Sequence, residues 1–231
     1  MQPYFLPYLG YFALLKHTDL FILFDTPQYI RHGWIERNRI LSLKGEPIYI
    51  KVPLVKHKRD AVINHILINN SLQWKQKIYA QLQHYKKKAP YYNNTILLLD
   101  RIFEDEYYDI TSLNAKALTI ISEYLEISTP IKIWSKMDVE IEAANHPDEW
   151  ALNICKAIDA KTYYNPIGGK DFFNKEKYTN DNVVLKFLEI EPISYKQFSN
   201  EFEPFLSIID VLMFVDKKSI MEMLTQIKLI D

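Results

Sequence analysis

A basic and polar stretch, IRHGWIERNRI, occupies residues 30–40, shortly after the apolar run LFILF. It combines three arginines with a histidine, a tryptophan and an asparagine. An arginine guanidinium can hold a phosphate or a carboxylate through two parallel hydrogen bonds, and an indole ring offers a flat surface for stacking. These residue types favour a site for a nucleotide diphosphate or an acyl phosphate. The alternative is that the arginines pair with nearby acids and only brace a sheet.

A helical turn over residues 33–40 would place positions three and four apart on one face. The residues gathered on or beside that face would be Trp34, Arg37, Asn38, Arg31 and Arg39. We expect Arg37 and Arg39 to hold phosphate or carboxylate, and Trp34 and tyrosines to stack on a sugar or a base.

A second candidate is the loop QPYFLPYLG at the start of the chain. Its two prolines stiffen the backbone, and Gly10 permits close approach at the start of a helix, where free amides can bind an anion. As a phosphate loop it is weak, because it has one glycine where recognised loops have two or three. The candidate substrate contacts in this loop are Gln2, Tyr4, Tyr8, Gly10 and Tyr11.

Two residues are candidates for a general base. His17 ends a helix-like segment and lies near Asp19 in the sequence, so it could cap the helix or accept a proton. Asp25 directly follows an apolar run that reads as a buried strand. Gln28, three residues later, is a further candidate substrate contact.

The segment NPIGGKD follows a strand-like run at residues 165–171. The backbone amides at Gly168 and Gly169, with Lys170 beside them, could cradle a carboxylate or a phosphate. The alternative is a tight turn in which one of the two glycines has a positive φ.

Asp210 stands alone in the apolar run FEPFLSIIDVLMF. A buried acid without a partner is destabilising, so we expect Asp210 to pair with a basic residue, such as an arginine of residues 31–39. No HExxH pattern or similar ligand spacing occurs, so no metal site is predicted. The cofactor stays open, because no cofactor-binding loop is complete.

Strand-like and helix-like segments alternate along most of the chain, which predicts an α/β fold with a mainly parallel sheet covered by helices. We expect a single domain over residues 1–231, with a helical insertion at about 72–110. In open α/β sheets, ligands bind outside the carboxyl ends of the strands. Three polar clusters follow predicted strands and could meet there: Asp25–Arg39, Asn145–Glu149 and Asn165–Asp171. We expect the pocket to be formed by the Gln2–Tyr11 loop, Asp25–Arg39 and Asn165–Asp171.

The composition is that of an ordinary globular protein, with 48% hydrophobic residues and a formal net charge of −1. An anion site must therefore be a local concentration of basic groups. The single cysteine excludes an internal disulfide and favours a reducing cytoplasm. No apolar run reaches the roughly 18 residues that a membrane span needs.

Three long motifs in this order, MQPYFLPYLGYF, DLFILFDTPQYIRHGWIERNRI and FEPFLSIIDVLMF, resemble those of the WbqC-like family of bacterial proteins. The resemblance runs through nearly the entire chain. Members of this family occur in polysaccharide and O-antigen gene sets, often beside sugar aminotransferases. The resemblance implies a role in making or decorating an amino-dideoxy sugar, by transfer of an acyl or aminoacyl group to its nitrogen.

Two classes of function follow from the resemblance. As an enzyme, the protein would transfer an acyl or aminoacyl group, with charged tRNA as one conceivable donor, to a nucleotide-linked amino sugar. The amine must lose a proton to attack, so a base is required, with His17 or Asp25 as the candidate. As a non-catalytic subunit, it would hold a sugar nucleotide for a partner aminotransferase or glycosyltransferase.

Overall fold

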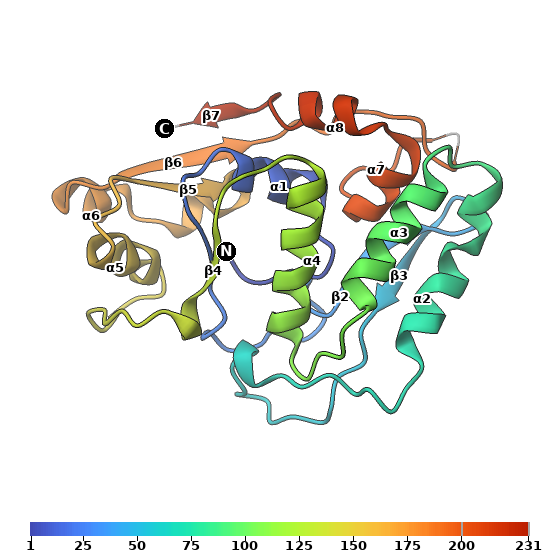
Figure 1. The fold of residues 1–231 in the computed structure, drawn as a ribbon. Coiled ribbons are helices and arrows are strands. Elements are labelled where there is room, and N and C mark those ends of the chain that lie inside the picture. The colour runs from blue at the N-terminus through green and yellow to red at the C-terminus, as the bar shows by residue number, and fades with distance from the viewer. Residues whose placement is uncertain (200, 231) are drawn as a thin grey trace. The chain divides into compact units, whose positions relative to one another are not determined.

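The computed structural model describes residues 1–199 and 201–230 and has a mixed α/β architecture (Figure 1). The chain divides into two compact units. The first unit comprises Met1–Ser135 and Pro192–Thr225, and the second comprises Lys136–Glu191 and the residues from Gln226 onward. The α/β class predicted from the sequence is confirmed.

The first unit holds two small sheets and most of the helices. Strand β1 (Phe21–Leu23) is parallel to β4 (Ile131–Ile133), and β2 (Arg37–Leu41) is antiparallel to β3 (Pro47–Lys51). The α-helices are α1 (Leu9–Lys16), α2 (Trp74–Leu82), α3 (Tyr92–Phe103), α4 (Ile110–Tyr124), α7 (Ile208–Phe214) and α8 (Lys217–Met223). The 3-10 helices are η1 (Ile63–His65), η2 (Gln83–Lys87) and η3 (Trp134–Lys136), which follows β4.

The second unit is built on one three-stranded sheet. Strand β5 (Thr162–Pro166) is parallel to β6 (Val184–Glu189), and β7 (Lys228–Ile230) is antiparallel to β6. The remaining elements are α5 (Glu149–Ala157), η4 (Ile167–Phe172) and α6 (Lys175–Asn180). Its buried core is formed by Leu152, Cys155, Tyr178, Val183, Leu185 and Phe187.

The sheets of the described residues are small and partly antiparallel, in place of the mainly parallel sheet that we predicted. The connection between β2 and β3 shows the reason. It is a short turn in which Ser42 N–H donates to the Glu46 carbonyl and Gly45 has a φ of +84°. So short a connection can join only antiparallel strands, because a parallel crossover needs a dozen or more residues.

The stretch from residue 72 to residue 110 contains α2, η2 and α3, in agreement with its helical periodicity. Trp74, Ile78 and Leu82 form the buried face of α2 at spacings of four residues. Among the described residues, no helix is both long enough and apolar enough to cross a membrane.

The helical turn predicted at residues 33–40 is wrong, because the chain enters β2 at Arg37. Side chains alternate along a strand, so Arg37 and Arg39 lie on the partly exposed face and Asn38 lies on the buried face. Trp34, Arg37 and Asn38 therefore do not share one face. Near the end of the chain, α8 stops at Met223, and Lys228–Ile230 is a strand.

The N-terminal loop is held by buried side chains from distant parts of the first unit. The Asn38 amide donates to the carbonyls of Phe5 and Leu6 at 3.0 and 2.9 Å. The Asn114 amide, on α4, donates to the carbonyls of Pro3 and Ile35 at 2.8 and 2.9 Å. The Asn38 amide thus ties β2 to the N-terminal loop, and the Asn114 amide ties α4 both to that loop and to the segment before β2.

The other end of the chain completes this arrangement. Ser207, the N-cap of α7, donates its hydroxyl to the Leu6 carbonyl at 2.7 Å, and the next amide, of Ile208, donates to the Pro7 carbonyl at 2.9 Å. The Tyr11 hydroxyl donates to the Gln2 carbonyl at 2.7 Å. Five carbonyls of the loop therefore have protein donors, as buried backbone groups require.

We expect Asn38→Ala to destabilise the protein by about 2–4 kcal/mol, because it removes two buried hydrogen bonds and leaves one carbonyl, that of Phe5, without its donor. Chemical denaturation followed by tryptophan fluorescence measures the change. Asn94→Ala, at an exposed position of α3, is the matched control and should leave the stability unchanged. Equal stability of the two variants would contradict a clamping role for Asn38.

Candidate functional site

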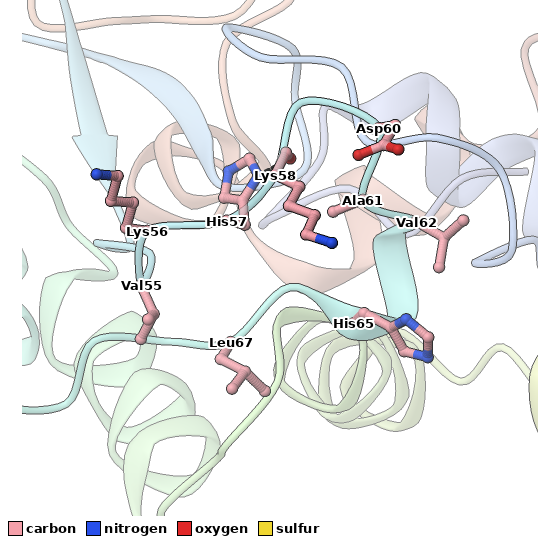
Figure 2. Close-up of a pocket in the computed structure, with 9 residues that line it drawn as sticks. All are labelled: Val55, Lys56, His57, Lys58, Asp60, Ala61, Val62, His65 and Leu67. Carbon is pink, nitrogen blue, oxygen red and sulfur yellow. Dashed lines mark hydrogen bonds between the residues drawn. The ribbon is translucent and has the colours of Figure 1, made fainter.

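A hollow of about 570 Å³ opens on the first unit, within the loop of residues 55–67 (Figure 2). Its charged and titratable lining residues are Lys56, His57, Lys58, Asp60 and His65. Figure 2 shows the loop running around an open centre, with the Lys58 side chain directed into it in this view. The lining therefore has more basic than acidic groups.

The loop around the hollow is fixed to the segment that follows β1. Tyr29 N–H donates to the Ala61 carbonyl at 2.9 Å, and Ile63 N–H donates to the Pro27 carbonyl at 3.0 Å. The Gln28 side chain donates to the Arg59 carbonyl at 2.9 Å. Gln28, a predicted substrate contact, thus holds the backbone of the basic loop.

Several cations near the hollow are not neutralised by acids. Lys56, Lys58, Arg59 and Arg31 are exposed, and none of them forms an ion pair within the described residues. Asp60 is the acid that lines the hollow. Positive charge therefore accumulates here in a chain whose formal net charge is −1.

Tyr29 connects the hollow to the predicted arginine cluster. Its ring meets the His57 ring edge-on, with 5.0 Å between centroids. Burial, followed by a hydrogen bond to Glu36, raises the pKa of the Tyr29 hydroxyl, while the charges of Arg37 and Arg31 lower it. Both arginines therefore lie close enough to Tyr29 to act on its hydroxyl. The Glu36 carboxylate is buried, and its Oε2 has no hydrogen-bond partner among the described residues.

Arg37 is engaged within its own loop. Its guanidinium donates to the carbonyls of Gly33 and His32 and lies 4.2 Å from the centroid of the Tyr49 ring. These contacts order the turn before β2, whose residue His32 has a left-handed φ of 64°. They leave fewer donors for a ligand than the sequence predicts.

Arg39 is engaged by the C-terminal motif. Its Nη1 pairs with Glu203 at 2.9 Å, and its Nη2 donates to the Pro204 carbonyl at 3.2 Å. Trp34, with 39% of its surface exposed, lies beside this pair, 6.0 Å from the guanidinium. Arg39 therefore joins two motifs that are far apart in the sequence.

The two predicted bases have partners inside the fold. Both Asp25 carboxylate oxygens are taken by Ser135, from its amide at 3.0 Å and its hydroxyl at 2.6 Å, so that Asp25 ties the end of β1 to the turn after β4. His17 is the C-cap of α1, and its Nδ1 lies 2.8 Å from the Ala13 carbonyl. Neither residue lines the hollow. Their catalytic role stays a prediction.

The side chains of the N-terminal loop divide into buried and partly exposed sets. Tyr11 is buried, while Gln2, Tyr4 and Tyr8 are partly exposed. A Cβ at position 10 would come within 2.3 Å of the Tyr8 ring, so Gly10 is needed to let that ring lie over the start of α1. The glycine thus serves a packing contact within the loop itself.

Asp210 does not pair with an arginine, which corrects the sequence prediction. Its carboxylate accepts the Tyr85 hydroxyl at 2.6 Å and the Tyr195 hydroxyl at 2.9 Å. Burial raises the pKa of Asp210 to about 6, and the two tyrosine hydrogen bonds partly oppose this rise. Two neutral hydroxyl groups thus donate to the carboxylate that we predicted to pair with a basic residue.

The predicted glycine segment belongs to the second unit. Gly168, Gly169 and Lys170 lie in η4, and neither glycine has a positive φ, so a left-handed turn is not the reason for them. A Cβ at position 169 would come within 2.1 Å of the Asn165 amide, whereas position 168 faces open space. Binding of an anion at these residues stays a prediction.

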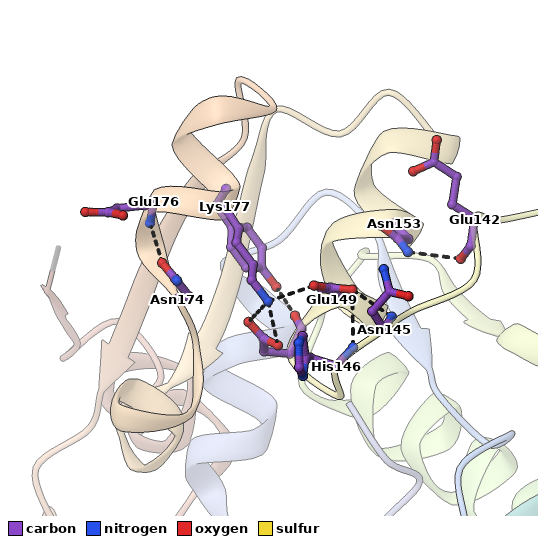
Figure 3. Close-up of polar contacts among 10 residues, drawn as sticks. Glu142, Asn145, His146, Glu149, Asn153, Asn174, Glu176 and Lys177 are labelled. Atoms are coloured by element: carbon purple, nitrogen blue, oxygen red, sulfur yellow. Dashed lines mark hydrogen bonds and ion pairs between the residues drawn. The ribbon is translucent and has the colours of Figure 1, made fainter.

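A second charged group of this unit surrounds Lys177 (Figure 3). Its ammonium pairs with Glu149 at 2.7 Å and with Asp148 at 3.2 Å. The hydrogen bond from Lys177, followed by that from the Asn145 amide, lowers the pKa of Glu149 to about 2. The ammonium of α6 is thus paired with two carboxylates at the start of α5, which indicates a structural link between α5 and α6.

The basic loop was not among the sites predicted from the sequence. Its signal is the run KHKR at residues 56–59, directly after the segment that contains β3. His65 lies further along the chain, in η1, and it lines the same hollow as residues of the run in the folded loop. The charge run was visible in the sequence, but the hollow that it surrounds depends on the folded loop.

The chain is similar to a protein family and to a curated protein. The family model of the WbqC-like protein family matches residues 2–222. The chain is similar to a curated protein named "Uncharacterized protein Rv1507c" from Mycobacterium tuberculosis (strain ATCC 25618 / H37Rv), with 28% identity over 215 residues. That similarity covers 92% of this chain and 90% of the relative. No solved structure matches the chain significantly.

We predict that Asp210→Asn flattens the pH dependence of stability between about pH 4 and pH 7. The folded-state pKa of Asp210, about 6, lies above its unfolded value, so its favourable contribution is complete below about pH 4 and is lost as the pH rises through 6. The difference amounts to about 3 kcal/mol. Urea unfolding of both proteins across this range measures it. Identical slopes for the two proteins would contradict the prediction.

Proposed function

Because the chain belongs to the WbqC-like protein family, we propose that it transfers an acyl or aminoacyl group to the amine of a nucleotide-linked amino-dideoxy sugar. The product would enter a bacterial surface polysaccharide such as an O-antigen. The family match crosses both compact units, and we propose that they work as one domain.

The observation that carries the proposal is the uncompensated positive charge around the hollow of residues 55–67. The diphosphate of a nucleotide-linked sugar carries at least two negative charges, and it fits cations that no protein acid neutralises. Lys58 lines the hollow, and Arg31 lies close to Tyr29, which contacts the lining residue His57. Exposed pairs of this kind contribute up to about 1 kcal/mol each, so several must act together.

His57 is the residue that we propose as the general base. Its Nδ1 lies 2.8 Å from the Lys58 carbonyl, which favours the tautomer with a proton on Nδ1 and a lone pair on Nε2. His57 lines the hollow, whereas the ring of His17 and the carboxylate of Asp25 are engaged elsewhere in the fold. We therefore assign to His57 the role that the sequence suggested for the other two.

The reaction proceeds by attack of the sugar amine on the carbonyl carbon of an activated acyl or aminoacyl donor. A nitrogen–carbon bond forms, the bond from that carbon to the donor's leaving group breaks, and the amine proton passes through His57 Nε2 to the leaving group. The cations Lys58 and Arg31 are suited to stabilise the negative charge that develops on the carbonyl oxygen.

A non-catalytic role has one observation in its favour. Asp25 and His17, the bases that the sequence offers, are both hydrogen-bonded within the fold. In that reading the hollow binds the sugar nucleotide and presents it to a partner aminotransferase or glycosyltransferase. Binding is common to both functions, so transfer is what separates them.

We predict that Lys58→Ala and Arg31→Ala each weaken the binding of a nucleotide-linked 4-amino sugar by up to about fivefold. Titration calorimetry at low and high salt measures the change, and the loss should shrink as salt screens the charges. Lys86→Ala, on the exposed side of η2, removes the same charge elsewhere and should leave the affinity unchanged. Equal affinities for all three variants would contradict the site.

We expect His57→Ala to abolish transfer while it preserves binding. The protein is incubated with the nucleotide-linked 4-amino sugar, ATP and glycine, or with charged glycyl-tRNA, and the sugar product is weighed by mass spectrometry. A mass gain with the natural chain that disappears with His57→Ala supports the enzyme. Tight binding with no mass gain from any donor leaves the binding subunit as the function.

A further inference from the structure

Phe205 combines two unfavourable features. Its φ is 57°, in the left-handed region that bulky residues avoid, and its ring is 49% exposed. Such backbone strain costs about 1–3 kcal/mol, and an exposed ring recovers only part of the free energy that burial would give. Neither feature helps the chain to fold, so the ring calls for another explanation.

The strained conformation is imposed from both sides of Phe205. On one side, Arg39 donates to the Pro204 carbonyl at 3.2 Å. On the other side, Ser207 N–H donates to the Arg39 carbonyl at 2.8 Å and Ile208 N–H donates to the Pro7 carbonyl at 2.9 Å. The backbone around Phe205 is therefore held to β2 and to the N-terminal loop.

Two other aromatic rings, one of them partly exposed and one exposed, lie near Phe205 or near Arg39. The Tyr8 ring meets the Phe205 ring edge-on at 5.8 Å, and Tyr8 is itself fixed over Gly10. Trp34, 39% exposed, lies 6.0 Å from the Arg39 guanidinium. We call Tyr8, Trp34 and Phe205 the aromatic platform.

The charge of the platform differs from that of the hollow. Arg39 pairs with Glu203 at 2.9 Å, and the exposed fractions of the two side chains are 25% and 30%, respectively. The pair offers both donors and acceptors for hydrogen bonds but no net charge. A neutral ligand group with hydroxyls and an apolar face suits such a surface, whereas a phosphate suits the unpaired cations of the hollow.

We infer that the aromatic platform binds the sugar ring of the nucleotide-linked substrate, a part of the ligand that the basic hollow does not recognise. This inference rests on the proposed function. The C–H face of a deoxygenated hexose stacks on the exposed rings, and its hydroxyls meet the Arg39–Glu203 pair. A deoxysugar fits better than a fully hydroxylated one, because loss of a hydroxyl enlarges the apolar face.

Phe205→Gly separates this role from a structural one. Glycine adopts the left-handed region without strain, so the variant removes the ring and the strain together. The melting temperature should stay the same or rise, whereas affinity for the sugar-linked nucleotide should fall about tenfold, the loss of roughly 1.4 kcal/mol. Phe205→Asn, which also tolerates a positive φ without the added backbone freedom of glycine, should behave alike.

The probes are thymidine- and uridine-diphosphate-linked 4-amino-4,6-dideoxyhexoses, with the two free nucleoside diphosphates beside them, all titrated by calorimetry. The variants should bind the free nucleoside diphosphates as the natural chain does. Trp34→Ala should likewise weaken only the sugar-linked forms. Leu97→Ala, at an apolar residue of α3 in the first unit that is 62% exposed, is the control and should change no affinity.

Three outcomes overturn the inference. A lower melting temperature of Phe205→Gly with unchanged sugar affinity makes the ring structural. If light scattering shows that the substitution halves the molecular mass, the natural chain is a dimer and the platform is the interface between its two copies. If the natural chain binds free and sugar-linked diphosphates with equal affinity, the platform does not bind the sugar, and the hollow still binds the diphosphate. If neither form binds, the proposed function itself is contradicted.

Discussion

The hydrogen-bond requirements of the N-terminal loop are the constraint on which the first unit depends. The loop is rich in proline and buried, so its carbonyls cannot be satisfied by water or by a regular ladder. Asn38, Asn114 and Ser207 satisfy most of them from β2, α4 and the start of α7. Each donor comes from a different part of the chain, so forming these bonds brings the three elements together around the loop. Neighbouring bonds to the same loop and to β2, from Ile208 N–H to the Pro7 carbonyl and from Ser207 N–H to the Arg39 carbonyl, hold the backbone next to the strained Phe205.

This constraint explains why polar residues that look like ligand contacts belong to the fold. Asn38 and Asp25 are fully hydrogen-bonded in the interior, and Arg39 bridges to Glu203. A polar motif that must be satisfied internally and one that binds a ligand have the same residue types, and spacing alone does not separate them. What separates them is whether a partner exists in the fold. By that criterion Arg31, Lys56, Lys58 and Arg59 remain available to a ligand, because they form no ion pair within the described residues.

Local periodicity was enough to predict much of the fold and little of the site. The helical periodicity of residues 72–110 depends on neighbours a few residues away, and α2, η2 and α3 lie in that stretch. The strand at Arg37–Leu41 was missed because its sequence, RNRIL, places a buried asparagine between two arginines. Its inward position follows from carbonyls more than thirty residues away. Asp210 was misread for the same reason, since its tyrosine partners lie 125 and 15 residues away in the sequence.

The two parts of the proposed site, the aromatic platform and the basic loop around the hollow, differ in backbone strain and in charge. His32 and Phe205 both have left-handed backbone conformations. Arg37 donates to the His32 carbonyl, and Arg39 donates to the carbonyl of Pro204, which precedes Phe205. Each arginine donates to carbonyls of the strained segment, so the cation holds a backbone that would otherwise relax. The arginines that the sequence offers as phosphate ligands thus act mainly as braces. Arg39 braces the backbone beside the ring of Phe205, and Arg37 braces the turn that follows Arg31. The platform rings and the cations around the hollow remain available for a ligand with both a sugar and a phosphate.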